Sequence, residues 1–142
     1  MVNLGNLDQK QGRVEQARYW YERALATGHP DQAPLAMNNL GRWESEQGRV
    51  EQARHWYEQT IATADNKVTP AAMVNLGILE EERGRVEQAR HWYEQTIATG
   101  HPEYSATAQS GLHDLDRRQR ELRRAEWDAQ YGWGYVDPRD EP

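Results

Sequence analysis

The sequence predicts an all-α fold in which antiparallel helix pairs stack side by side into a solenoid. The first observation is a repeat: Gly12, Gly48 and Gly84 each begin the string GRVEQAR, which therefore returns every 36 residues. The second is the helical spacing of the apolar residues within each repeat. The third is the glycine between the two helical patterns of a repeat, a residue that commonly ends helices.

The second helix of each repeat begins just after its glycine. Residues 48–63 and 84–99 both read GRVEQARHWYEQTIAT, and residues 12–27 depart from this string at only four positions. Apolar and small residues of the string recur at spacings of three and four, which places them on one face of a helix. In the second repeat these residues are Val50, Ala53, Tyr57, Thr60 and Ile61.

A second helical stripe precedes each glycine. In the second repeat it contains Leu35, Ala36, Leu40 and Trp43 and ends at Gly48. A glycine just past a helix can adopt the left-handed conformation that closes the last turn, and such a short connection forces the next helix to return antiparallel. Each repeat is therefore expected to be an αα-hairpin.

In chain order, the predicted helices occupy residues 1–11, 14–27, 34–47, 50–63, 70–83, 86–98 and 106–130. Pro34 and Pro70 suit the first turns of their helices, and Thr69 and Ser105 are the predicted N-caps. The predicted units are the hairpins 1–33, 34–69 and 70–105, the long capping helix 106–130 and a flexible aromatic and acidic tail, 131–142.

These recurring residues resemble the tetratricopeptide repeat. The Leu40-Gly41 pair, the turn glycine Gly48, and Ala53 followed by Tyr57 match the family pattern, and their counterparts recur one repeat away. Thr60 replaces the family's last alanine, and the 36-residue period with its longer linker is similar to Sel1 repeats. The resemblance covers residues 1–118 and implies a right-handed superhelix of αα-hairpins that binds other proteins.

The resemblance also implies a binding surface. In this family the first helices of the hairpins line the concave side, and positions around the Leu-Gly pair contact a bound peptide. Here those positions are Val2, Asn3, Asn6, Asn38, Asn39, Arg42, Val74, Asn75 and Ile78. The recurring asparagines Asn3, Asn39 and Asn75 either pair with an extended peptide backbone or bond to the neighbouring hairpin.

Charge narrows the class of partner. Glu46, Glu81 and Glu82 make the far end of this surface acidic, which favours a basic or mixed peptide over a C-terminal carboxylate. The net charge of −6 and pI near 5.4 give no general attraction to nucleic acid or anionic lipid. No apolar run is long enough to span a membrane and the first residues do not resemble a secretory signal, so we expect a cytoplasmic protein.

No group of residues indicates catalysis, a cofactor or a metal. The sequence has no cysteine, and its serines lie outside recognisable nucleophile motifs. His55 and His91 are equivalent positions one repeat apart, too distant to share a metal, and His29 and His101 lie in linkers. We therefore expect a non-enzymatic protein without a cofactor.

Two charged runs have alternative interpretations. Glu80, Glu81 and Glu82 are expected to be a solvated helix face rather than an acid-base or cation site. The arginines between 117 and 124 are interleaved with acids, so a polar-backed capping helix is favoured over a nucleic-acid surface.

The predicted function is a protein- or peptide-binding scaffold. The alternative is a structural solenoid that self-assembles end to end into oligomers or filaments, and a third reading is a fragment of a longer regulator. Val2, Leu4, Leu7 and Trp20 lie at the N-terminal end, where no polar cap is evident. We expect a second copy to cover this end, with the aromatic tail or another protein as alternatives.

Overall fold

The computed structural model describes residues 14–28, 31–132 and 139, with side chains from residue 18 onward. Helices account for 82% of the described residues, which contain no strand. They are α2 (Val14–Ala26), α3 (Ala33–Glu46), α4 (Val50–Ala62), α5 (Thr69–Glu82), α6 (Val86–Ala98) and α7 (Pro102–Tyr131). The helix predicted at 1–11 lies outside the described residues.

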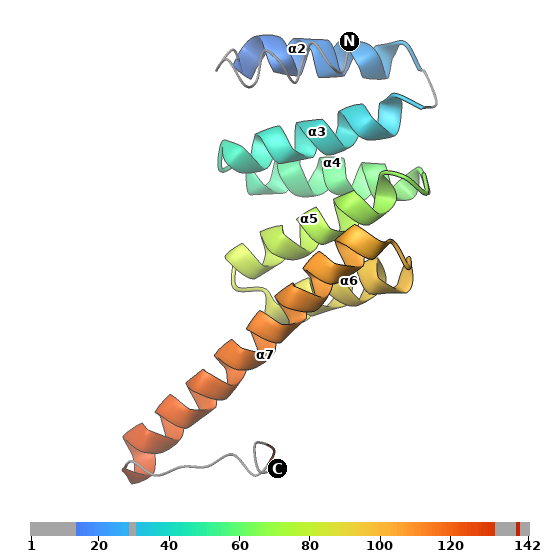
Figure 1. Ribbon diagram of the computed structural model, residues 1–142. Coiled ribbons are helices and arrows are strands. Elements are labelled where there is room, and N and C mark those ends of the chain that lie inside the picture. Colours follow the sequence, from blue (N-terminus) through green and yellow to red (C-terminus); the bar gives the residue numbers. More distant parts are fainter. Residues whose placement is uncertain (1–13, 29–30, 133–138, 140–142) are drawn as a thin grey trace.

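The helices form an α-solenoid, as predicted. Figure 1 shows α2 to α6 stacked in chain order, with α3 and α4 forming one antiparallel hairpin and α5 and α6 the next. The first part of α7 packs on α6 and α5, and its C-terminal part projects beyond the stack (Figure 1). None of the described helices is long and apolar enough to cross a membrane.

Glycines close the first helix of each hairpin. Gly48 and Gly84 have φ angles of 75° and 74°, in the left-handed region where a Cβ is unfavourable. The residue after each glycine forms a hydrogen bond with the last turn of the helix. The Arg49 N–H donates to the Glu44 carbonyl and the Arg85 N–H donates to the Glu80 carbonyl, both at 2.9 Å. This confirms the predicted turns.

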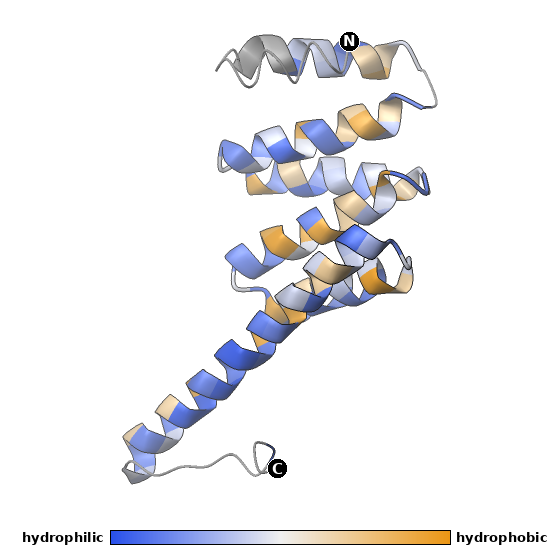
Figure 2. Ribbon diagram, viewed as in Figure 1, coloured by the Kyte–Doolittle hydropathy of each residue, from blue (hydrophilic) through white to orange (hydrophobic). Residues whose placement is uncertain are grey.

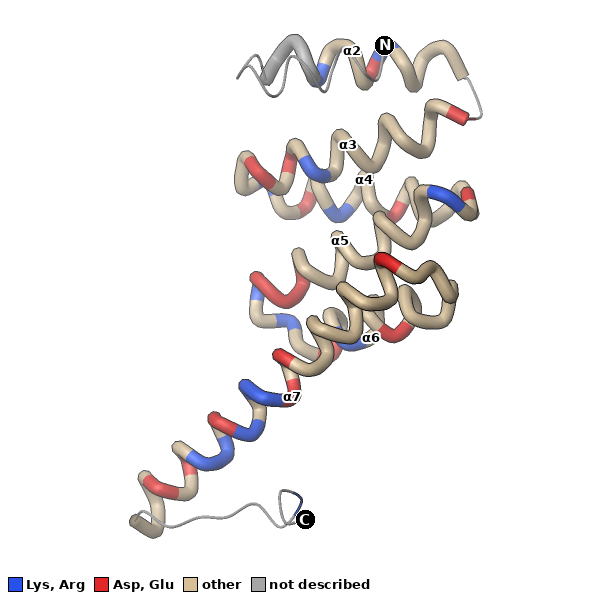
Figure 3. The backbone as a smooth tube through the Cα atoms, viewed as in Figure 1, with Lys and Arg blue, Asp and Glu red and all other residues tan. Residues whose placement is uncertain are grey.

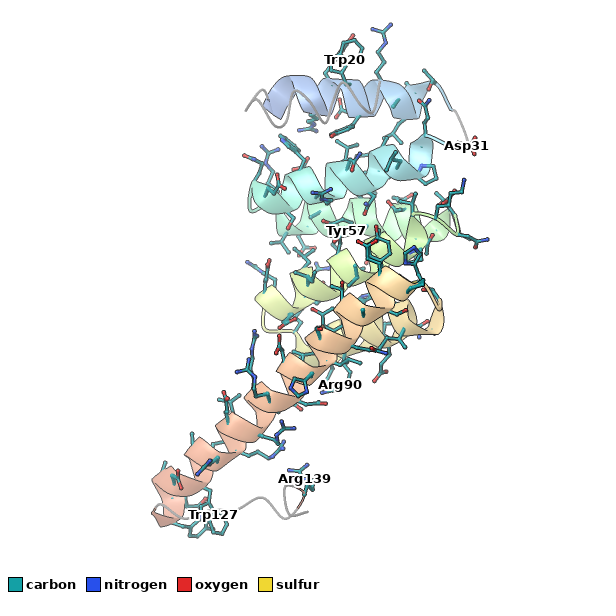
Figure 4. All side chains as sticks on the ribbon, in the orientation of Figure 1. Trp20, Asp31, Tyr57, Arg90, Trp127 and Arg139 are labelled. Carbon is teal, nitrogen blue, oxygen red and sulfur yellow. The ribbon has the colours of Figure 1, made fainter. Side chains whose placement is uncertain are left out.

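The core lies between the second helix of one hairpin and the first helix of the next. Tyr57 of α4 packs with Ala72 and Leu76 of α5, and Trp92 of α6 packs against the same cluster. Figure 4 shows Tyr57 between α4 and α5. Stability in such an arrangement comes from each hairpin burying its neighbour's apolar face.

Three glycines allow tyrosine rings to pack against helix backbones. A Cβ built on Gly41 would lie 2.6 Å from Cδ1 of Tyr57, and one on Gly77 would lie 2.7 Å from Cε1 of Tyr93. Gly111 of α7 would come within 2.6 Å of the opposite edge of Tyr93. The close approach predicted at Gly41 is confirmed.

Both predicted N-caps are wrong. α7 begins at Pro102, four residues before the predicted start, and its N-cap is His101, whose Nδ1 accepts a hydrogen bond from the Tyr104 N–H. Proline at the first position and the histidine acceptor together satisfy the helix start, which leaves Ser105 inside the helix. Thr69 is the first residue of α5 and makes no capping bond, because Asp65 Oδ1 caps the preceding turn.

α7 has the character of a capping helix. Ala108 and Leu115 are buried against the preceding hairpin. At positions 36 residues after the buried Val74 and Gly77 of α5, α7 has Ser110 and His113, both exposed. Beyond its packed part, α7 is mostly hydrophilic (Figure 2).

Candidate functional site

The predicted binding residues differ in accessibility. Val2, Asn3 and Asn6 lie outside the described residues. On α3 and α5, the buried members of the predicted set are Asn38, Asn39 and Val74, with 6%, 5% and 3% exposure. Arg42 and Ile78 are exposed and Asn75 is half-buried.

The asparagines connect two hairpins. Asn75 Nδ2 donates to Asn38 Oδ1 at 3.3 Å, which joins α5 to α3. The equivalent residue Asn39 is buried, and its Nδ2 has no hydrogen-bond partner in the described structure. Asn39 and Asn75, which share one position in the repeat, therefore have different surroundings.

We give the name α3/α5 surface to four accessible residues of these two helices: Leu35, Arg42, Asn75 and Ile78. Leu35 and Ile78 are 39% and 38% exposed, which is substantial for large apolar side chains. Two apolar side chains beside a guanidinium and an amide give this surface contacts for both apolar and polar groups.

Charges of both signs lie near the α3/α5 surface. Burial raises the pKa of the Tyr57 hydroxyl, Arg42 opposes this rise, and Glu46 and Glu82 add to it. The hydroxyl of Tyr57 thus senses one guanidinium and two carboxylates from α3 and α5. The field at this end of the surface is mixed in sign.

The carboxylate run of α5 is not a uniformly solvated face, so this prediction was wrong for two of its three residues. Glu80 is buried, at 2% exposure. Glu81 accepts a hydrogen bond from the Tyr93 hydroxyl at 2.5 Å and pairs with Arg118 at 3.1 Å. Only Glu82 is exposed. Successive helix positions point in different directions, so the three consecutive glutamates lie in three different environments.

Three ion pairs form a ladder along the solenoid, in which the acids Glu44 and Glu80 are buried and Asp116 is half-exposed. In each rung an arginine of one hairpin's second helix reaches an acid of the next first helix. The pairs are Arg18–Glu44 at 3.9 Å, Arg54–Glu80 at 2.7 Å and Arg90–Asp116 at 2.6 Å. Figure 4 shows Arg90 where α6 and α7 meet. Glu44 and Glu80 also pair with the turn arginines Arg49 and Arg85, at 3.2 and 3.6 Å.

This ladder accounts for both arginines of the GRVEQAR string. The sequence signal that could have found it is the 36-residue spacing of Glu44, Glu80 and Asp116, which matches that of the arginines. The hydrogen bond to Asp116 raises the pKa of Arg90, and those to Glu51 and Glu80 raise that of Arg54 against the effect of burial. These ion pairs connect neighbouring hairpins.

The arginines of α7 are balanced by acids. Figure 3 shows the two signs alternating along its projecting part. Arg117 pairs with Asp114 and Glu121, at 3.5 and 3.9 Å, and Arg118 with Glu81. This interleaving is the one expected of a polar helix face.

The histidines of α4 and α6 contact aromatic rings. The rings of His55 and Trp56 lie 5.2 Å apart between centroids, and those of His91 and Trp92 lie 5.0 Å apart, edge to face in both pairs. In the described part of the chain, no three His, Asp or Glu side chains are grouped in a way that could hold a metal ion.

Comparison with known proteins gives a family and a fold. The sequence matches the tetratricopeptide repeat over residues 1–66 and again over 35–100. The Sgt2 TPR domain from Aspergillus fumigatus is similar with a TM-score of 0.69 and 19% identity, over 99% of this chain and 87% of that one. BtubC (BKLC) from P. vanneervenii is similar with a TM-score of 0.67 and 20% identity, over 99% of this chain and 67% of that one. No curated protein matches the sequence.

Proposed function

Because the chain belongs to the tetratricopeptide repeat family, we propose that it is a non-enzymatic scaffold that binds a protein or an extended peptide on its α3/α5 surface. The observation that carries this proposal is the exposure of Leu35 and Ile78 beside Arg42, on helices whose other sides are buried in the stack. Apolar side chains that remain accessible on such helices are available for a partner.

The chemistry of the surface describes the partner segment. Asn75 uses its Nδ2 on Asn38, so its Oδ1 can accept from a peptide N–H, while Arg42 can donate to a carbonyl. Leu35 and Ile78 would contact apolar side chains. Glu46 and Glu82 oppose a C-terminal carboxylate near Arg42, so we favour a segment with apolar residues and basic or mixed charge.

Substitutions on the surface test this function. Partners are first captured from the source organism with the full chain, and the affinity of the captured partner is then measured for Ile78→Asp and Arg42→Glu. Both should lose at least about tenfold in affinity, since an apolar or charged contact at a desolvated interface centre contributes about 1–2 kcal/mol. Gln59→Asp, an exposed change on α4, is the matched control.

Comparison with the control Gln59→Asp decides whether the α3/α5 surface binds the partner. Circular dichroism should show unchanged helicity for all three variants, because none of the substituted side chains is buried. If Ile78→Asp and Arg42→Glu bind the partner as tightly as Gln59→Asp does, the α3/α5 surface is not the binding site.

A second candidate function is self-association through the N-terminal end. Trp56 packs against Tyr21, Ala24, Ala36 and Leu40 of the two preceding helices. Trp20 occupies the same place in its repeat, and the adjacent Tyr19 is 53% exposed. Figure 4 shows Trp20 on the side of α2 away from α3.

The polar outer face of α7 limits the form that such an assembly takes. Ser110 and His113 offer no apolar stacking face, so association would pair two N-terminal ends instead of extending a filament. Light scattering over a concentration series tests this, with and without residues 131–142. A mass that stays monomeric in both proteins would exclude pairing.

A further inference from the structure

A cavity of about 470 Å³ lies outside the α3/α5 surface, at one edge of the stack. Figure 1 shows the α4–α5 and α6–α7 linkers on this same edge. The residues that line it and matter here are Ile61, Asn66, Thr69, Pro70, Met73 and His101. Its volume lies in the range of sites that hold small ligands.

An unsatisfied hydroxyl belongs to the wall of this cavity. Thr69 is 9% exposed, and its Oγ1 is buried without a hydrogen-bond partner. A buried hydroxyl without a partner costs about 1–3 kcal/mol, so its persistence calls for a physical reason. An acceptor brought in by a ligand would supply the missing bond.

The linker at the cavity also departs from the repeat. Residues 64–69 read ADNKVT, where the other linkers read GHPDQA and GHPEYS. Ala64, which lines the cavity, has a φ angle of 54°, whereas Gly28 and Gly100 at the same place have 64° and 73°. Ala64 is thus held in a conformation that costs a residue with a Cβ about 1–2 kcal/mol.

The remaining groups describe what would fit. Ile61, Pro70 and Met73 supply apolar walls. Nδ1 of His101 accepts from Tyr104, so the proton of the neutral ring is on Nε2, which can donate. None of the described residues that line the cavity carries a carboxylate, and Asp65 Oδ1 already accepts from the Lys67 and Val68 N–H groups. Donors over apolar walls suit an apolar group next to a carbonyl, and neither a cation nor a bare anion.

We propose that this linker cavity binds one large apolar side chain of a partner polypeptide, with the adjoining backbone carbonyl accepting from the Thr69 hydroxyl. The proposal rests on the proposed function in that the occupant is a polypeptide. It adds a second contact region, on the linker edge, that would fix which residue of the partner is held there.

The probe is N-acetyl-leucine N-methylamide, titrated into the full chain while backbone amide resonances are followed by nuclear magnetic resonance. We expect saturable shifts at Thr69, Met73 and His101. Thr69→Val keeps the shape of the side chain and removes the hydroxyl, so the probe should bind about fivefold more weakly, which corresponds to one lost hydrogen bond. Thr63→Val, outside the cavity, should bind it as the unchanged protein does.

Three results would overturn the proposal. One is the absence of saturable shifts at the cavity, and another is equal affinity of Thr69→Val and Thr63→Val. The third is tighter binding of 4-methylpentanoate than of the capped leucine, which would assign the cavity to a free small acid.

The α3/α5 variant separates this proposal from the proposed function. Ile78→Asp should lower the affinity for the partner at least about tenfold and leave the affinity for the capped leucine unchanged. If only the partner affinity of Ile78→Asp stays unchanged, the proposed function of the α3/α5 surface is wrong. If only the capped-leucine titration shows no binding, the proposal for the linker cavity is wrong.

Discussion

Replacing Ala64 with glycine should stabilise the protein. Ala64 has a φ angle of 54°, and the left-handed region costs a residue with a Cβ about 1–2 kcal/mol. Glycine removes this cost, but it also increases the conformational entropy of the unfolded chain, which lowers the stability by about 0.4–1 kcal/mol. The expected gain is the difference, about 0.5–1 kcal/mol, or a rise in Tm of about 1–4 °C for a domain of this size.

The converse substitution at the equivalent position is the matched control. Gly100 has a φ of 73°, and a Cβ built on it meets nothing within 4 Å, so Gly100→Ala tests conformation without a steric clash. It should lose about what Ala64→Gly gains. Urea unfolding followed by circular dichroism measures both. Destabilisation by Ala64→Gly, or no effect of Gly100→Ala, would refute the argument from backbone strain.

Three further predictions concern the contacts between helices. Gly41→Leu should lower stability by about 1–3 kcal/mol because its side chain would enter the ring of Tyr57; an unchanged Tm would show that the helices can separate without cost. Glu80→Ala should cost about 1–3 kcal/mol in urea unfolding, because the half-buried Arg54 then keeps only its exposed partner Glu51, whereas the exposed Glu58→Ala should change little; equal effects would deny the ladder a structural role. Burial, together with Glu81, raises the pKa of Tyr93, so the folded state holds this proton more tightly than the unfolded state and stability should fall as pH rises above 10. Tyr93→Phe should flatten that fall between pH 9 and 11, and an identical slope in both proteins would contradict it.

Most of the fold could be predicted from the sequence because the repeat supplies the same information several times. The predicted starts of α2, α4 and α6 agree with the structure, because each of these helices begins at the valine of the GRVEQAR string. The start of α7 could not be predicted in this way. His101-Pro102 looks like a linker in sequence, yet the imidazole acts as the cap and the proline begins the helix.

The candidate surface was harder to predict than the fold. Arg42 and Ile78 are accessible, whereas Asn38 and Asn39 are buried. Their burial comes from contact with other helices, which the helical spacing of residues does not predict. Glu80 was missed for a different reason, since its partner Arg54 is 26 residues away. Within one repeat such a charge looks like one that faces water, and only the shared 36-residue spacing of the two charges marks the pair.

The ion-pair ladder makes the junctions between hairpins interchangeable. Arg18 and Glu44 at one junction, and Arg90 and Asp116 at another, bring together the same two charges from the same two kinds of helix. Removal of residues 49–84 would therefore leave Glu44 followed by Arg85, as it is now followed by Arg49, and both remaining rungs would keep their partners. A gene that gains or loses one such unit in frame would change the length of the protein without creating an unmatched buried charge. The number of hairpins can thus vary more freely in evolution than the residues at any one junction.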